Sequence, residues 1–366
     1  MTPPRPARSM RHRVAVRRSH PTHPQRERPE GRSPLAAWLF GLVGIGALIF
    51  VVLRSGDLHR FQLLVSRAQP LWLLVALALQ GGTYVFVALG WGAVLRRAGA
   101  RQPLGKLIPI AVTKLFADQV VPSAGIGGNL VLVDRLVAIG TPRGTAVAAL
   151  LVSMVGFYAA YALLAIAMLL VLWLHHQATP LLAGLVTALL MVAIAIPALA
   201  LWLRRRGSRP LPRRIERIAV VRNLVRAVGE APAALVADRR LIAQVAGWNA
   251  LVFIADAATL EACLLALGAS PSPGTSFVAV MAASIVVTLG PIPLGLGTFE
   301  ATSTAMLRLL GVPVVAALAG TLLLRSMTLW LPLIPGLFLM RRAVAHPAHG
   351  HKEHARHHGD RPGDAR

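Results

Sequence analysis

Two glycine- and proline-rich breaks interrupt this apolar chain at matching places in two similar halves. The first break lies in residues 120–136 (VVPSAGIGGNLVLVDRL) and the second in residues 289–307 (LGPIPLGLGTFEATSTAML). Several glycines repeat at an offset of about 170 residues: Gly99 with Gly268, Gly125 with Gly295, Gly127 with Gly297, and Gly140 with Gly311. Short broken segments in corresponding places of two apolar halves are typical of the binding site of a membrane transporter. The pattern predicts a membrane protein built from two repeats.

Composition agrees with a membrane location. Hydrophobic residues make up 55% of the 366 residues and charged residues only 14%, which is too little charge for a soluble domain of this size. The net charge of +24 is concentrated in blocks, with nine arginines in residues 1–34 and eleven in residues 204–240. Basic segments beside apolar spans orient membrane proteins and attract anionic headgroups. We therefore expect an anionic membrane surface, and not nucleic acid, as the partner of these arginines.

The apolar stretches predict an all-α integral membrane protein. A spanning helix needs about 20 apolar residues. Six stretches are long enough: residues 35–53, 70–95, 145–174, 180–203, 241–267 and 314–340. Four shorter arms flank the two breaks: residues 106–120, 129–139, 275–289 and 298–311. Short arms favour two re-entrant hairpins, and eight or more tilted spans are the alternative. The residues predicted to make the breaks are Pro122, Gly125, Gly127, Gly128, Pro291, Pro293, Gly295 and Gly297.

Charge in the connecting segments predicts the topology. The segments rich in Arg and Lys are expected in the cytoplasm: residues 1–34, 96–106, 204–240 and 341–366. Two loops lack both residues and are expected outside: residues 175–179 and 268–274. The loop 54–69, with three arginines, is the exception. Both termini are then cytoplasmic, and repeat units 70–174 and 241–340 have opposite orientations.

Three domains follow from these assignments. A disordered basic tail (residues 1–34) precedes the transmembrane domain (residues 35–342), and a His-rich tail (residues 343–366) follows it. The tail histidines have no fixed geometry, so we expect no metal site there.

Charged residues in the first broken arm are the first candidate site residues. Lys114 and Asp118 are four residues apart and share one face of a helix, where they can neutralise each other. A pair that anchors the hairpin is one interpretation. A headgroup contact, with Lys114 taking a phosphate, is the other.

The second half supplies further charges at membrane depth, where each costs a few kcal/mol or more. Glu300 opens the arm after the break, where a carboxylate can cap the helix; a cationic headgroup contact or a protonation switch is the alternative. Asp256 lies near the middle of its span and Arg325 eleven residues into another. We infer that Arg325 pairs with Asp256 or Glu300, either to hold spans together or to bind a lipid phosphate through two oxygens.

Helix starts at the breaks suggest a further kind of contact. Helix ends at residues 125–128 and 295–297 are expected to leave free backbone N–H groups, which form an anion site.

The motifs around the second break resemble a known family. PIPLGLGTFE (residues 291–300), LLGVP (309–313) and LLLRSMTLWLPLIPG (322–336) are similar to the lysylphosphatidylglycerol synthase transmembrane-region family, also called flippase-like. This family includes the flippase half of the multiple peptide resistance factor. PSAGIGGN (residues 122–129) resembles its first Pro-Gly motif. The resemblance implies an integral protein of the bacterial or archaeal cytoplasmic membrane with a role in lipid translocation.

The first half departs from the family pattern. The family often has an acidic residue where this chain has Asn129, and an arginine where it has Leu132. Met154 stands where the first-half counterpart of Arg325 would be. No aminoacyl-transfer domain follows Arg342, so we expect no lysyl-lipid synthesis by this chain.

A flippase for a phospholipid or a lipid-linked headgroup is the leading functional hypothesis. The sequence contains no Walker motif and implies no cofactor, so transport would be downhill or ion-coupled, with Asp256, Glu261 or Glu300 as proton carriers. One alternative is a scaffold that recruits a cytoplasmic lipid or cell-envelope synthesis enzyme. A glycosyltransferase that uses a polyprenyl-phosphate sugar is a weaker alternative, because the outer loops lack paired carboxylates.

Overall fold

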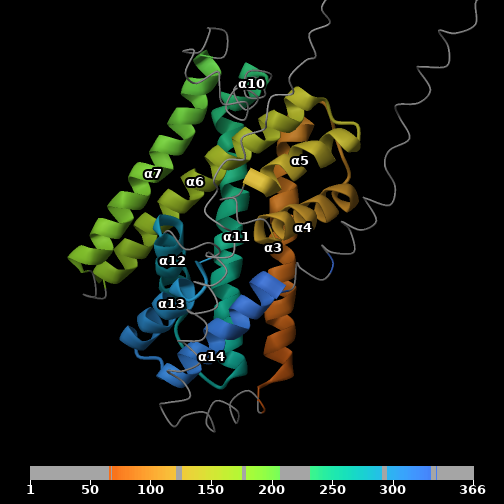
Figure 1. Cartoon of the computed structure of the whole chain (residues 1–366). Coiled ribbons are helices and arrows are strands. Elements are labelled where there is room, and N and C mark those ends of the chain that lie inside the picture. Colours follow the sequence, from red (N-terminus) through yellow and green to blue (C-terminus); the bar gives the residue numbers. More distant parts are fainter. Residues whose placement is uncertain are drawn as a thin grey trace, which may run out of the picture.

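The structure is a computed structural model that describes residues 66, 68–120, 126–174, 179–206, 231–290, 295–330 and 335. Within these ranges its regular elements are all helices (Figure 1). The predicted span 35–53, both terminal tails and most of the basic loop lie outside the described residues. So do four of the predicted break residues: Pro122, Gly125, Pro291 and Pro293.

Three helices of the described part are long and apolar enough to cross a membrane: α3 (Pro70–Arg97), α6 (Arg143–Leu174) and α11 (Arg239–Ala266). A fourth, α7 (Pro180–Arg206), has a shorter apolar stretch at Pro180–Ile196. These helices confirm four of the predicted apolar elements. Large apolar side chains on α6 and α7, such as Leu163, Trp173 and Leu181, are exposed. Their exposure is favourable only where lipid replaces water.

Helices α3 and α11 form an antiparallel pair that is tied at both ends. At one end the backbone N–H of Gln69 donates to the carbonyl of Ala266 at 2.8 Å. At the other, Nε of Arg97 donates to Oδ2 of Asp238 at 2.9 Å. The pair runs through the middle of the molecule in Figure 1. The second bond also brings two segments with predicted cytoplasmic locations to the same end.

The helix caps repeat between the two halves. Gly99 after α3 and Gly268 after α11 have φ angles of 74° and 77°, while Gly140 and Gly311 have 91° and 93°. The residue after each glycine donates its backbone N–H to the carbonyl of the residue five positions earlier: Ala100 to Leu95, Ala269 to Leu264, Thr141 to Leu136, and Val312 to Leu307. This bond belongs to the Schellman motif, which favours glycine at the left-handed position. Matching caps on oppositely directed helices are what an inverted repeat requires.

Each half contains two short helices around its break. In the first half these are α4 (Leu104–Val120) and α5 (Ile126–Ala138); in the second, α12 (Pro273–Leu289) and α13 (Thr298–Leu309). The longest have 17 residues, fewer than the roughly 20 that a span needs. Their positions agree with the predicted arms, and α4 packs on α5 as α12 packs on α13.

Two boundaries differ from the predictions. Gly127 and Gly128 belong to the first turn of α5 and are not part of the first break. The predicted span 314–340 begins at Val314, but α14 (Val314–Arg325) gives way to a π-helical turn, η2 (Ser326–Trp330). Short π-helical turns are frequent at functional sites.

The tie between α3 and α11 gives a pH prediction. The hydrogen bond from Arg97, with help from the backbone N–H groups at the start of α11, lowers the pKa of Asp238 below its usual value. A carboxyl group whose pKa is lowered by folding stabilises the protein at pH values above its pKa in the unfolded chain. This stabilisation is lost as the pH falls through its pKa in the folded protein. We expect the melting temperature in detergent to fall as the pH drops below about 4, and to fall less in Asp238→Asn, which keeps a capping side chain. Equal acid sensitivity of the two proteins would contradict this role.

Candidate functional site

The second break is capped by a buried carboxylate. Helix α13 begins after Gly297, whose φ of 81° reverses the chain. Glu300, in the first turn, accepts the backbone N–H of Gly297 through Oε2 at 2.7 Å. This is half of a capping box, because Gly297 has no side chain that could accept a hydrogen bond from the backbone N–H of Glu300. The bond from Gly297 to Glu300 satisfies one N–H that the start of a helix otherwise leaves unpaired.

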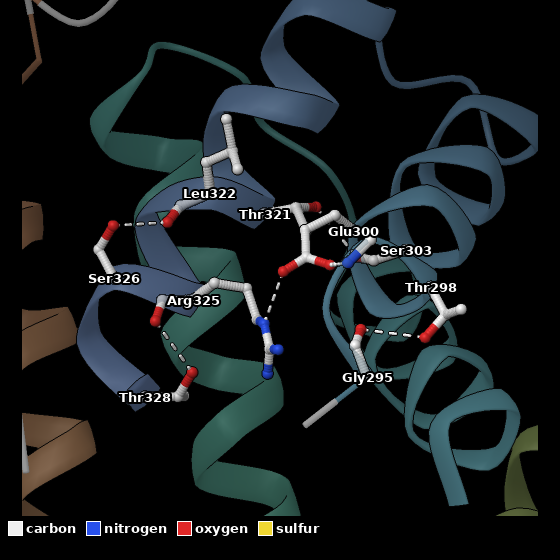
Figure 2. A network of polar contacts seen from close by, with 10 residues as sticks. Gly295, Thr298, Glu300, Ser303, Thr321, Leu322, Arg325, Ser326 and Thr328 are labelled. Carbon is white, nitrogen blue, oxygen red and sulfur yellow. Dashed lines mark hydrogen bonds and ion pairs between the residues drawn. The ribbon is translucent and has the colours of Figure 1, made fainter. Parts of the chain in front are cut away.

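Arg325 completes this part of the site. Its Nε donates to Oε1 of Glu300 at 2.8 Å (Figure 2). Its guanidinium lies 4.9 Å from the centre of the Phe299 ring. The side chains of Arg325 and Glu300 are only 13% and 5% exposed. Of the two carboxylates predicted as partners of Arg325, the structure selects Glu300. A hydrogen bond of 3.0 Å between Ser303 and Thr321 joins the same two helices, α13 and α14.

The first break also has an ion pair whose carboxylate accepts a backbone N–H at the start of the following helix. Nζ of Lys114 lies 2.6 Å from Oδ2 of Asp118, which confirms the predicted pair. Oδ1 of Asp118 accepts the backbone N–H of Gly128 at 3.2 Å, in the first turn of α5. A Cβ at Gly128 would overlap this carboxylate, so only glycine allows the approach. Each break therefore combines a carboxylate, a cation and a backbone N–H at the start of the following helix.

The prediction of free N–H groups at these helix starts is wrong for Gly128 and Gly297. The carboxylates of Asp118 and Glu300 occupy the places that an external anion was expected to take. The physical reason is the apolar surroundings, in which an unsatisfied N–H costs several kcal/mol.

A hydrogen bond between the halves joins α4 of the first hairpin to the turn that follows Arg325. Nε2 of Gln119, next to Asp118 on α4, donates to the carbonyl of Thr328 at 3.1 Å. Thr328 lies in η2, three residues after Arg325. Neither Gln119 nor Thr328 was among the residues predicted for the site. Gln119 could have been identified as a candidate, because it is an amide beside a charged pair in an apolar arm. No residue pattern in the sequence predicts the π-helical turn that contains Thr328.

Other candidates lie apart from these pairs. Asp256 on α11 lies level with Gln80 of α3, in the register set by the two ties between these helices. Glu261, on the same helix, accepts a hydrogen bond from Ser276 of α12. Asn129 follows Gly128 on α5, and within the described ranges no hydrogen bond joins it to either pair. Met154, in the place of a first-half arginine, packs against the apolar core.

The contact between the halves can be tested against a matched glutamine. Gln119→Leu is expected to cost about 1 kcal/mol, because the carbonyl of Thr328 loses its donor. Gln102→Leu removes a similar bond, of 3.2 Å to the carbonyl of Ile139, but within the first half. Thermal unfolding in detergent should show similar small losses for both variants. Only Gln119→Leu should also alter lipid movement in liposomes; equal effects of the two would contradict a functional contact between the halves.

Long apolar helices with lipid-compatible outer faces define an integral membrane protein of the all-helical class. The chain matches the family model described as lysylphosphatidylglycerol synthase TM region over residues 38–336. Since this match covers well over half of the chain, the protein belongs to that family. A search of curated proteins found no match.

Proposed function

We propose that the protein moves a phospholipid or a lipid-linked headgroup across the membrane, at the contact between α4 of the first half and η2 of the second. Membership of the lysylphosphatidylglycerol synthase TM family supports a role in lipid or envelope metabolism. The observation that carries the proposal is the bond from Gln119 to Thr328, which joins the segments that hold two ion pairs, one from each half. The pair of Arg325 and Glu300 is largely buried, and the pair of Lys114 and Asp118 is half-buried. Charges at membrane depth are costly and mark substrate pathways.

The chemistry of the pairs suits an anionic headgroup. The guanidinium of Arg325 can engage two oxygens of a phosphate, and Lys114 supplies a second positive charge. In the present structure Glu300 and Asp118 neutralise these cations. A lipid phosphate would compete with the carboxylates of Glu300 and Asp118 for these two cations.

The arrangement of the halves supports alternating access. The arms around the breaks are too short to span, and α3 and α11 run antiparallel. We infer that the two hairpins are re-entrant and enter from opposite sides, so that rocking of one half against the other opens the site to each side in turn. The protein would reside in a bacterial or archaeal cytoplasmic membrane with both termini in the cytoplasm.

Lipid exposure in liposomes tests the proposal. The full chain is reconstituted with fluorescent phosphatidylglycerol or its aminoacylated form, and a membrane-impermeant quencher reports the label that reaches the outer leaflet. We expect exposure beyond that in protein-free liposomes, reduced in Arg325→Ala and retained in Arg308→Ala, which removes an exposed arginine of α13. Folded protein that exposes neither lipid would overturn the proposal and favour a scaffold that partners a cytoplasmic lipid-synthesis enzyme.

A further inference from the structure

A third acidic site lies between the two halves, at the contact of α3 and α11. Asp256 lies 17 residues after the start of α11. The two ties between α3 and α11, Gln69 to Ala266 and Arg97 to Asp238, place it level with Gln80 of α3, and Tyr84 lies one turn further along α3. Gln80 and Tyr84 are 5% and 8% exposed, and Asp256 is half-buried. The three groups form a polar cluster at the interface between the repeat units.

The surroundings of Asp256 distinguish it from Asp118 and Glu300. Each of those two carboxylates has a cation within 3 Å, whereas the side chain level with Asp256 on α3 is the neutral amide of Gln80. The elements packed on α11 offer few other charges. The ends of these helices carry arginines (Arg96, Arg97, Arg143, Arg239 and Arg240). The other ionisable groups on α11 itself, α3, α6 and α14 are Glu261, held by Ser276; Cys263; Tyr84; Tyr158; Tyr161, bonded to Thr288; and Arg325, paired with Glu300. Helix α12 has no ionisable side chain.

A neutral amide suits a carboxyl group that changes its protonation state. The amide N–H groups of Gln80 can donate to an ionised Asp256, and its carbonyl can accept from a protonated one. In the described part of the chain, Oε1 of Gln80 and the hydroxyl of Tyr84 have no hydrogen-bond partner. Because a side-chain amide can rotate to exchange its oxygen and nitrogen, Oε1 can turn to meet the proton of Asp256. A lysine or arginine at position 80 would instead hold the carboxyl ionised.

We propose that Asp256 is a proton-binding site which, with Gln80 and Tyr84, couples proton movement to rocking of the two halves. A proton from water on one side adds to a carboxylate oxygen of Asp256, and it leaves to water on the other side after the halves rock. No other bond forms or breaks. Gln80 belongs to one half and Asp256 to the other, so rocking of the halves alters the contact between these two side chains. Protonation of Asp256 changes the same contact. The coupling rests on the proposed function, but proton binding does not.

Infrared spectroscopy of the full-length protein tests proton binding without any lipid. A protonated carboxyl has a carbonyl band that a carboxylate lacks, so pH-difference spectra should contain a band that is lost in Asp256→Asn. Glu261→Gln, the matched control on the same helix, should retain that band. Gln80→Lys should also lose it, because the new cation keeps Asp256 ionised. Folded Asp256→Asn with an unchanged spectrum would overturn the proposal.

Lipid movement under an imposed pH gradient tests the coupling. We expect the gradient to change the rate of lipid exposure by wild-type protein, and the same gradient to have no effect on Asp256→Asn. If the rate of lipid exposure by wild-type protein is the same with and without the pH gradient, the coupling is overturned and the lipid-transport proposal stands. Absence of any lipid exposure would overturn the transport proposal and its coupling, and the infrared result would still decide whether Asp256 binds a proton.

Discussion

Arg325→Ala is expected to destabilise the protein by about 3–5 kcal/mol, because it leaves the carboxylate of Glu300 buried without its cation. Glu300 is 5% exposed, so water cannot replace the lost partner. The variant also removes the contact of the guanidinium with the Phe299 ring. Thermal or denaturant-induced unfolding in detergent micelles, followed by circular dichroism, measures the loss.

A second arginine provides the matched control. Arg97 pairs with Asp238 through the same atom, Nε, at 2.9 Å, but its side chain is 66% exposed. Exposed pairs contribute little, so Arg97→Ala should have a far smaller effect. Replacing Arg325 and Glu300 together should cost less than the sum of the single variants, since no buried charge is left unpaired. If Arg325→Ala cost no more than Arg97→Ala, the buried pair would not be holding α13 against α14.

Gly295→Ala should cost about 2–4 kcal/mol, from two separate effects. The φ of Gly295 is 61°, in the left-handed region that a residue with a Cβ adopts only with strain. A Cβ at this position would also overlap the side chain of Val287 on α12. The substitution therefore separates the two arms of the second break, and unfolding in micelles measures its cost.

Gly99→Ala isolates the first of these effects. Gly99 has a φ of 74°, but a Cβ there would meet nothing within 4 Å. Its substitution should cost only the backbone strain, about 1–2 kcal/mol. A cost for Gly295→Ala no larger than for Gly99→Ala would mean that α12 and α13 are not closely packed at the break.

Much of this architecture can be predicted from the sequence because it depends on local patterns. Glycine offsets predicted two similar halves, and the nearly equal φ angles of Gly99 and Gly268 agree with this prediction. Apolar length located the long helices, and interrupted length located the arms of both breaks. The i,i+4 spacing of Lys114 and Asp118 predicted their ion pair, since residues at that spacing share a helix face, and the structure contains the pair.

Features that depend on packing between distant segments could not be predicted. The choice of Glu300 over Asp256 as the partner of Arg325 follows from how α13 packs on α14. The bond from Gln119 to Thr328 needs the π-helical turn, for which no residue pattern is specific. The occupation of the helix starts by Asp118 and Glu300 depends on where each carboxylate lies after folding.

The most direct test of a site at the contact between the two halves is to cross-link α4 to η2 and follow lipid exposure. Cys263 is the only cysteine, so Gln119→Cys and Thr328→Cys in a Cys263→Ala background give a unique pair for a short, reducible thiol cross-linker. Each single-cysteine variant treated with the same reagent serves as the control. Cross-linked protein should stop exposing labelled lipid in liposomes, and reduction should restore the exposure. Cross-linked protein that exposes lipid at the uncross-linked rate would contradict a transport site at this contact.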